Sequence, residues 1–324
     1  MEREAAQLRT HRFGSREVSV IGLGTADFGG RIAESLAREF LDAYIGIKGN
    51  FIDTARVYGD FATPKNGESE KVIGRWISDR HCRDQVFLST KGGHPPLGNM
   101  RLGRLGRAEI RADIQASLED LQTDCVDIYW LHRDEISRPT GEIMETLQEL
   151  LEDGYTRLTG VSNWTPSRIM EANAYAAAHG LAPLYANQPQ FSLAVQAFFP
   201  DDTLVSMDAA AFRMHKETGM TCCCFSSQAH GFFTKLDEAG ESGLPESIKA
   251  QYLCKENRRI FQRIKQVRQA TGLDVSSIAL AYLTCQPFPT FALAGASRAE
   301  HITALEKAGN ATLSASQLKD LRSF

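Results

Sequence analysis

The stretch VFLSTKGG, residues 86–93, is an apolar run that ends in a lysine followed by two glycines. Three other stretches share this design: FIDTARVYG (51–59), VDIYWLHRDE (126–135) and LTGVSNW (158–164). In each of them, β-branched and aromatic residues typical of a buried strand lead to a polar residue near the end of the run. A segment with helical periodicity follows each stretch, and this alternation predicts parallel strands joined by helical crossovers.

The alternation continues along the chain and predicts a (β/α)8 TIM barrel, because eight parallel strands close this fold. The expected strands are at 19–25, 51–55, 86–91, 126–132, 158–163, 184–191, 220–227 and 290–297. The expected helices are at 33–47, 68–80, 108–122, 141–154, 166–180, 203–218, 255–271 and 274–285.

The barrel is expected to carry additions at both ends of the chain. Near the start, an N-terminal β-hairpin turning at Gly14-Ser15 is placed to plug the N-terminal end of the barrel. Two C-terminal extra helices are expected at 298–308 and 314–322. The segments 92–107 and 228–254 are expected to be long loops beyond the C-terminal ends of strands. No composition shift marks a boundary, so we expect a single domain over residues 1–324.

The composition excludes several classes of function. The 324 residues have a net charge of −4 and are 43% hydrophobic, which indicates neither a nucleic-acid partner nor a membrane-surface partner. No apolar run is long enough for a membrane span, and the N-terminal segment MEREAAQLRTHRFG lacks the apolar core of a secretory signal. We therefore expect a cytoplasmic protein; its oligomeric state stays open.

The seven cysteines do not suggest a metal site. Cys222, Cys223 and Cys224 are consecutive, and in a strand their side chains would alternate between the two faces, so they cannot all bind one metal. We interpret them as small buried apolar residues of a reduced protein.

Four polar residues lie at or just beyond the C-terminal ends of three successive predicted strands, where a barrel brings such residues together. They are Asp53, Tyr58, Lys91 and His132. A buried lysine beside a tyrosine favours the phenolate, so the phenol gives up its proton more readily. The aspartate in turn would hold the lysine charge. This combination is suited to protonating a carbonyl oxygen while a hydride reaches the carbonyl carbon.

Each of these residues has a simpler structural interpretation when it is taken alone. Asp53 could cap a helix, but Tyr58-Gly59 intervenes before any helical pattern begins. Lys91 could be a solvated strand tip, and His132 could be a hydrogen-bonded structural residue. Their joint placement on successive strand ends favours a functional site.

Later strand ends carry residues suited to a nucleotide coenzyme. Ser162, Asn163 and Gln188 can bond a carboxamide, and Phe225 offers a flat ring for stacking. The stretch from Gly295 to Arg298 leads into a helix start, which can hold a phosphate. A Rossmann fingerprint is not present, because Gly22-x-Gly24 is followed by Asp27 where the third glycine should stand.

Taken together, these motifs resemble the aldo-keto reductases over roughly residues 8–310. The motifs stand in the order and spacing of that family: GLGT, DTARVYG with GESEKVIG, STKGG, DIYWLH, GVSNW, NQPQFS and GAS. The resemblance implies a barrel that binds NADP(H) extended across the C-terminal face of its strands. It implies that Tyr58 is the general acid, that Lys91 and Asp53 tune it, and that His132 orients the carbonyl.

The resemblance also implies residues for the coenzyme and the substrate. The coenzyme-binding residues would be Gly24, Thr25, Asp53, Ser162, Asn163, Gln188, Phe225, Ser226, Gly295, Ser297, Arg298 and His301. The expected pocket walls are Phe28, His94, Arg133, Trp164, Phe191 and Phe232. Where the family usually has a glutamine or arginine and then an asparagine near the adenosine, this chain has His301 and Leu305. NAD(H) therefore stays open as the alternative coenzyme.

The expected activity is NADPH-dependent reduction of an aldehyde or ketone, with a sugar-derived carbonyl as one substrate class. The alternative is a nicotinamide-binding regulatory subunit that senses redox state, as some proteins resembling this family do for membrane channels.

Overall fold

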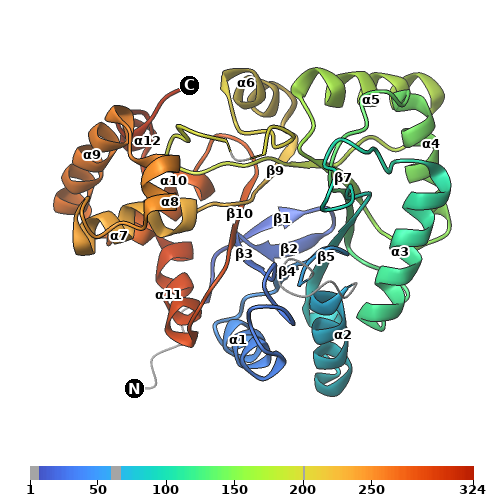
Figure 1. The fold of residues 1–324 in the computed structure, drawn as a ribbon, viewed down its shortest axis with the longest axis horizontal. Coiled ribbons are helices and arrows are strands. Elements are labelled where there is room, and N and C mark those ends of the chain that lie inside the picture. Colours follow the sequence, from blue (N-terminus) through green and yellow to red (C-terminus); the bar gives the residue numbers. More distant parts are fainter. Residues whose placement is uncertain (1–6, 60–66, 200) are drawn as a thin grey trace.

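The structure is a computed structural model that describes residues 7–59, 67–199 and 201–324. The charged residues 1–6 of the N-terminal segment lie outside the described residues. Eight parallel strands form a closed barrel in the order β10-β3-β4-β5-β6-β7-β8-β9 (Figure 1). The strands are β3 (Ile21–Gly24), β4 (Phe51–Asp53), β5 (Phe87–Gly92), β6 (Ile128–Leu131), β7 (Thr159–Ser162), β8 (Ala186–Gln188), β9 (Thr221–Cys224) and β10 (Thr290–Ala294).

Helices surround the barrel and confirm the predicted (β/α)8 TIM barrel (Figure 1). They are α1 (Glu34–Gly46), α2 (Glu68–Arg80), α3 (Arg107–Leu121), α4 (Thr140–Glu152), α5 (Pro166–His179), α6 (Ala209–Thr218), α7 (Phe232–Ala239), α8 (Glu246–Tyr252), α9 (Lys255–Thr271), α10 (Val275–Thr284), α11 (Ala299–Asn310) and α12 (Ala315–Leu321). Two short 3-10 turns, η1 (Arg83–Gln85) and η2 (Ala229–Gly231), complete the set. Within the described ranges, no helix is long and apolar enough to cross a membrane.

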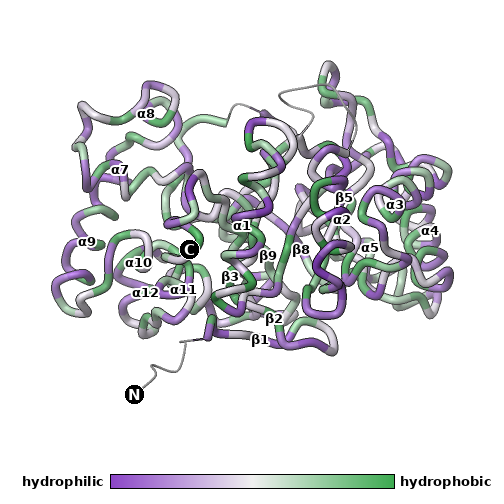
Figure 2. The backbone as a smooth tube through the Cα atoms, turned by 90° about the horizontal axis from the view of Figure 1, so that it is seen from below, coloured by the Kyte–Doolittle hydropathy of each residue, from purple (hydrophilic) through white to green (hydrophobic). Residues whose placement is uncertain are grey.

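The N-terminal hairpin closes one end of the barrel, as the sequence predicts. Its strands β1 (Thr10–Phe13) and β2 (Arg16–Ser19) pair antiparallel around the turn at Gly14-Ser15. The Phe13 ring lies 4.6 Å from the Phe87 ring and 5.0 Å from the Phe291 ring, so it fills the floor of the barrel. Figure 2 shows the hairpin at one end of the molecule, with α7 and α8 toward the other.

The core has two parts because strand side chains alternate between faces. Cys222 and Cys224 belong to the large core between strands and helices, while Cys223 lies in the inner core with Phe13 and Trp130. This alternation is the one that the sequence predicts for the three consecutive cysteines. The seven cysteines of the described chain are all free thiols.

The prediction of a long loop at 228–254 is wrong. The segment contains η2, α7 and α8, because Phe232, Phe233 and Leu236 form a buried apolar face on α7. The helix expected from residue 203 begins only at α6, where the Asp208 carboxylate accepts the Ala211 N–H at 2.7 Å as an N-cap. The predicted loop after β5 is confirmed, since residues 93–106 contain neither helix nor strand.

Candidate active site

A buried ion pair lies at the C-terminal end of the barrel. Lys91, near the end of β5, donates to Asp53 Oδ2 at 2.5 Å and to the Thr54 carbonyl at 2.8 Å. Lys91 is 0% exposed and Asp53 is 2% exposed. Burial lowers the pKa of Lys91, but the Asp53 charge and Tyr58 more than offset it, so the pKa ends above its usual value. Lys91 therefore stays protonated at physiological pH.

Neighbouring strands hold the Asp53 carboxylate in place. Ser89 Oγ donates to Asp53 Oδ1 at 2.6 Å, and Gln188 Nε2 donates to the same oxygen at 3.1 Å. The register of β4 and β5 pairs Asp53 directly with Ser89, so the parallel sheet itself aligns these two groups. Three donors thus compensate a carboxylate that has almost no access to water.

Tyr58 lies beside the ion pair, in the turn that follows β4. The Lys91 nitrogen is 4.6 Å from the centre of its ring. Desolvation by the surrounding protein raises the pKa of Tyr58, the Lys91 charge lowers it, and the Asp53 charge raises it again. The sequence correctly assigns the direction of the Lys91 effect. Burial raises the pKa of Tyr58 by more than the Lys91 charge lowers it, however, so the phenol keeps its proton across the physiological pH range.

An ion-pair network fixes the turn that carries Tyr58. The Arg56 N–H donates to the Lys91 carbonyl at 2.9 Å, which joins this turn to β5. The Arg56 guanidinium pairs with the buried Glu70 of α2 at 2.9 Å and also with Asp120 of α3. Thr90 Oγ1 donates to the other Glu70 oxygen at 2.5 Å. No motif singled out in the sequence pointed to this network.

A charged residue on an apolar helix face is the signal that could have revealed it. Glu70 shares its helix face with Ile73 and Ile77, at the spacing of successive helical turns. Charged residues are rarely buried without a partner, so such a position indicates a buried ion pair.

Two histidines lie next to each other at the edge of the site. The His132 ring is 5.7 Å from the Tyr58 ring and 4.7 Å from the His94 ring. Burial lowers the pKa of His132 well below the usual value, and the nearby His94, Lys91 and Arg133 lower it further. Burial, with a smaller effect of Arg133, lowers the pKa of His94 to about 4. Both imidazoles are therefore neutral at physiological pH.

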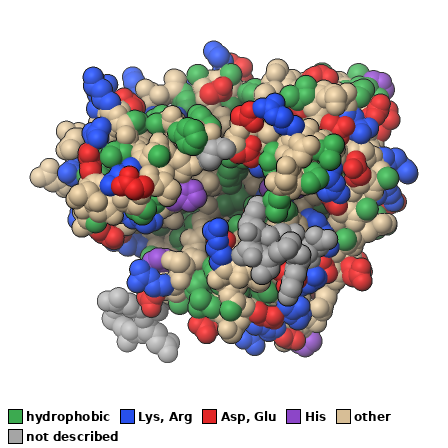
Figure 3. Space-filling view, in the orientation of Figure 1, with side chains coloured by type: hydrophobic (Ala, Val, Ile, Leu, Met, Phe, Trp, Pro, Cys, Tyr) green, Lys and Arg blue, Asp and Glu red, His purple; other side chains and the backbone are tan. Residues whose placement is uncertain are grey.

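Arg133 follows His132 and reaches across to the segment between β8 and α6. Its Nε donates to Thr203 Oγ1 at 3.2 Å, and its Nη2 lies 3.4 Å from Asp201 Oδ2. A third bond at 3.0 Å joins Nη1 to the His132 carbonyl. Figure 3 shows that this face of the molecule is hollowed near its centre, with histidine and basic side chains at the border of the hollow.

The residues expected to hold a carboxamide lie together at the ends of β7 and β8. Ser162 Oγ donates to the Gln188 carbonyl at 2.8 Å, and Asn163 Nδ2 donates to Ser162 Oγ at 3.0 Å. Asn163 has a left-handed backbone, with φ of 62°, and its amide also donates to the His132 carbonyl at 3.1 Å and accepts the Val205 N–H at 3.1 Å. Thr25, by contrast, is fully buried and uses its hydroxyl on the Asp53 carbonyl at 2.9 Å. Gly24, at the end of β3, is partly exposed.

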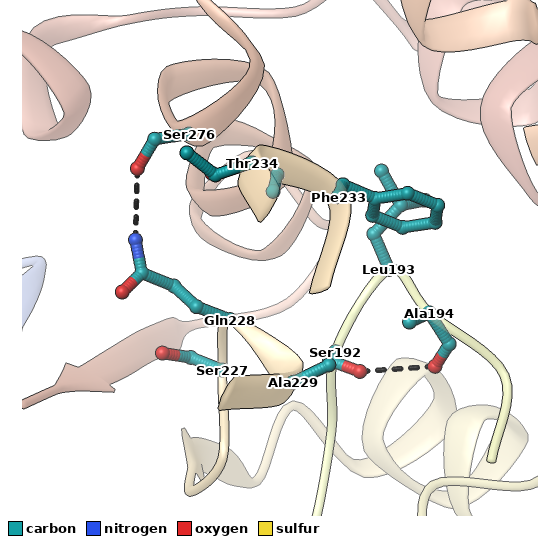
Figure 4. Close-up of a pocket in the computed structure, with 10 residues that line it drawn as sticks. Ser192, Leu193, Ala194, Ser227, Gln228, Ala229, Phe233, Thr234 and Ser276 are labelled. Carbon is teal, nitrogen blue, oxygen red and sulfur yellow. Dashed lines mark hydrogen bonds between the residues drawn. The ribbon is translucent and has the colours of Figure 1, made fainter. Parts of the chain in front are cut away.

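The loop after β9 has an unusual backbone. The half-buried Phe225 leads into Ser226, with φ of 51°, and then into Ala229, His230 and Gly231, with φ of 48°, 56° and 74°. Within this run the Ala229 N–H donates to the Ser226 carbonyl at 2.9 Å, and the Gly231 N–H donates to the Gln228 carbonyl at 2.8 Å, so the chain makes two tight turns before α7. A small pocket lies beside it, where Gln228 Nε2 donates to Ser276 Oγ of α10 at 2.8 Å (Figure 4).

The segment after β10 is open to solvent. Gly295, Ser297, Arg298 and His301 are exposed around the start of α11, and Leu305 on the same helix is buried. Ser297 Oγ lies 3.4 Å from His301 Nδ1. Within the described part of the chain, the Arg298 side chain makes no ion pair or hydrogen bond.

The expected pocket walls divide into two groups. His94 and Arg133 lie beside His132, as described above. The other four are packed into the protein: Phe28 against Phe40, Trp164 beneath the Arg168 guanidinium, Phe191 against Tyr282 and Phe324, and Phe232 against Phe233 and Tyr252. Each of these four side chains is at most 2% exposed.

Comparison with known proteins identifies the family of this chain. The model of the aldo/keto reductase family matches residues 20–324. The chain is 26% identical over 317 residues to a norsolorinic acid reductase of Aspergillus flavus, covering 94% of this chain and 77% of that protein. It is 29% identical over 323 residues to the aldo-keto reductase YhdN of Bacillus subtilis, covering 95% and 90%. It is 27% identical over 300 residues to an aryl-alcohol dehydrogenase of Pestalotiopsis microspora, covering 90% and 73%. The chain therefore belongs to the aldo/keto reductase family and is an NAD(P)H-dependent oxidoreductase.

Proposed function

We propose that the protein reduces an aldehyde or ketone with NADPH and that Tyr58 donates the proton. The observation that carries this proposal is the buried Lys91–Asp53 pair, with the Lys91 nitrogen 4.6 Å from the centre of the Tyr58 ring. A buried cation beside a phenol stabilises the phenolate that forms as the proton leaves. Asp53 keeps this cation charged in a site that would otherwise neutralise it.

Each polar group then has a distinct role. Bound NADPH supplies the hydride to the carbonyl carbon. Tyr58 remains protonated at physiological pH, so it is loaded as a general acid before the substrate arrives. The neutral His132 has one N–H, which we assign to orient the carbonyl oxygen toward the phenol. The Arg56–Glu70 pair holds the turn that fixes the position of Tyr58.

Several observations support a nicotinamide dinucleotide across this face. Phe225 presents a half-buried ring for stacking, and Ser162, Asn163 and Gln188 lie together at strand ends. Gly24 and Gly295 lie at the ends of the neighbouring strands β3 and β10. Because neither has a side chain, a ligand can approach the backbone there.

We assign the adenosine end to the start of α11. Exposed Arg298 and Ser297, with His301 one turn further on, lie where the helix N-terminus favours an anion. This arrangement suits the additional phosphate that distinguishes NADPH from NADH. The proposed preference is therefore for NADPH.

The experiment that tests this function combines a carbonyl panel with Tyr58→Phe. Oxidation of NADPH is followed by absorbance, with aromatic aldehydes, aliphatic ketones and sugar-derived carbonyls as substrates. In the variant, kcat should fall about 10²–10⁴-fold, the usual contribution of a general acid. Affinity for NADPH, measured by fluorescence titration, should stay near the wild-type value because the proposed coenzyme contacts lie on other strands.

Two outcomes would contradict the proposal. A near-normal kcat in Tyr58→Phe would show that the proton comes from another group. Tight NADPH binding without turnover of any carbonyl would instead favour a redox-sensing regulatory subunit.

A further inference from the structure

We propose that His94 is a specificity-determining residue whose Nε2 accepts a hydrogen bond from a hydroxyl group next to the reacting carbonyl. The preferred substrates would then be aldehydes and ketones that carry a hydroxyl on the adjacent carbon. This inference rests on the proposed function, because it assumes that the carbonyl binds between Tyr58 and His132.

The hydrogen bonding of His94 fixes its tautomer. Its Nδ1 lies 2.6 Å from the carbonyl oxygen of Pro95. A carbonyl can only accept, so Nδ1 must carry the proton of the neutral ring and donate it. Burial keeps the pKa of His94 near 4, so a second proton is not bound at physiological pH. Nε2 is thus left with a lone pair, and it has no hydrogen-bond partner within the described ranges.

The other groups around the reacting position are mainly donors. Lys91 and Arg133 are cations, Tyr58 carries its proton, and His132 has one N–H. The nearby Asp201 carboxylate is already engaged, because its Oδ1 accepts the Thr203 hydroxyl at 2.6 Å and its Oδ2 faces Arg133. His94 Nε2 therefore adds an acceptor to a site in which donors predominate, the second nitrogen of the neutral His132 being the other acceptor. A substrate hydroxyl is the natural complement, since it can donate to Nε2 and still accept from Arg133.

The position of His94 suits a group close to the carbonyl. Its ring contacts the His132 ring edge to face at 4.7 Å, and the His132 ring is 5.7 Å from the Tyr58 ring. A carbonyl oxygen that contacts both Tyr58 and His132 would thus lie close to the His94 ring, which packs directly against the His132 ring. A hydroxyl on the carbon next to the carbonyl can span this separation.

The turn that carries His94 is held rigidly. A Cβ atom at Gly92 would overlap the Tyr129 hydroxyl, and Gly93 has a left-handed φ of 68°, so both glycines are needed for the turn. The Gly93 N–H donates to Asp113 at 2.8 Å, and Arg104 joins Asp113 at 3.0 Å to the His94 carbonyl at 3.1 Å. Such support gives the acceptor a defined position before substrate binds.

The test compares substrates of equal shape that differ in the hydroxyl. Hydroxyacetone is matched with butanone, and 2-hydroxyacetophenone is matched with propiophenone. Methoxyacetone keeps the oxygen but removes its donor. The wild type should prefer each hydroxy ketone about ten- to a hundredfold in kcat/KM, because a ketone without the hydroxyl would cover the His94 acceptor and leave it unpaired. Methoxyacetone should behave like butanone.

Two variants separate the acceptor from the bulk of the ring. His94→Phe keeps a ring of similar size without an acceptor, and His94→Gln offers an amide oxygen in its place. The ratio of kcat/KM for a hydroxy ketone to kcat/KM for its matched ketone should fall to near one in His94→Phe. In His94→Gln this ratio should be partly retained. Titration with NADPH and thermal melting show whether each variant is folded and still binds coenzyme.

The outcomes distinguish this inference from the proposed function. Equal kcat/KM for hydroxy ketone and its isostere in the wild type overturns the role of His94, as does a preference unchanged in His94→Phe. Turnover of other carbonyls but of neither matched series also contradicts it. Failure of the wild type to reduce any carbonyl would contradict the proposed function itself.

Discussion

At the scale of single residues, the site contains two buried basic side chains, and each of them lies beside a carboxylate. Lys91 is paired with Asp53 at 2.5 Å, and Arg133 faces Asp201 at 3.4 Å. The first pair is almost completely shielded from water, while Asp201 is more open. Because removing one partner of a buried pair leaves an uncompensated charge, Asp53 is expected to matter to catalysis and to folding alike.

The start of α11, the proposed adenosine end of the site, gives a prediction about the choice between NADPH and NADH. Arg298→Ala should weaken NADPH binding about ten- to a hundredfold, the size of a lost charge-assisted hydrogen bond to phosphate. NADH lacks that phosphate, so its affinity should be nearly unchanged. Fluorescence titration of both coenzymes into wild type and variant measures the difference.

Lys319→Ala on α12 is the matched control, since it removes an exposed positive charge elsewhere on the surface. It should alter neither affinity. An equal loss for both coenzymes in Arg298→Ala, or no loss for either, would refute the phosphate contact.

The sequence predicted these residues unevenly. Asp53, Tyr58, Lys91 and His132 could be found because each stands at a strand end or in the turn beyond it, and the barrel topology brings such positions together. Phe191 and Phe232 were expected in the pocket wall, yet they pack against other aromatic side chains. An aromatic residue just after a strand can face the pocket or the helical layer, and only the path of the loop decides between them.

At the scale of elements, one buried carboxylate ties the hairpin to the barrel. Asp127, just before β6, is 1% exposed and contacts Arg16 of β2 at 3.2 Å, Arg83 of η1 at 3.0 Å and Arg157 at 3.4 Å. It also accepts the Leu88 N–H at 2.9 Å. Three segments distant in sequence therefore meet on a single side chain at the hairpin end of the barrel.

Asp127→Asn tests this junction. The amide keeps the size of the side chain but removes the charge that three arginines share, so the free energy of unfolding should fall by about 1–3 kcal/mol. Urea denaturation followed by circular dichroism measures the change.

Arg157→Gln provides the comparison, because that arginine side chain is 63% exposed and should contribute little. If Asp127→Asn unfolds at the wild-type urea concentration, the junction does not stabilise the hairpin end. The same result would leave the aromatic packing of Phe13 as the main attachment.

Element boundaries show where sequence patterns are informative. The strong apolar periodicity of 255–271 predicted α9 with its observed bounds. The region 228–254 was expected to be a loop because a glycine-rich stretch interrupts it. That stretch separates two short helices, α7 and α8, whose apolar faces are completed only by packing on the rest of the fold.

At the scale of the whole molecule, the barrel was predictable because helical segments separate all eight strands and the strands read as buried runs. The side-chain contacts between loops were not predictable. Arg133 meets Asp201 and Thr203 across 68 and 70 residues of sequence, and no local pattern links them. Loops after different strands converge only when the barrel closes.

The buried histidines give the whole fold a predictable response to acid. Burial lowers the pKa of His94 to about 4, lowers that of His132 well below normal, and lowers that of His215. Unfolding releases these rings into water, where they bind protons with a pKa of about 6.5. Their contribution to stability is therefore complete above pH about 6.5 and is lost as the pH falls below it.

The free energy of unfolding should thus decrease between pH 6.5 and 5, by up to about 1.4 kcal/mol per pH unit for each such histidine. Urea denaturation at a series of pH values gives the slope of this free energy against pH, which corresponds to one proton taken up on unfolding for each ~1.4 kcal/mol per pH unit. His94→Phe should reduce the slope at pH 5.5 by close to one proton, since the native ring is unprotonated there and the unfolded ring is charged.

Two results would contradict this prediction. A slope of zero across this range would mean that the histidines titrate alike in the folded and unfolded states. A slope unchanged in His94→Phe would mean that His94 is already protonated in the fold. The second result would also remove the lone pair on which the proposed recognition of a substrate hydroxyl depends.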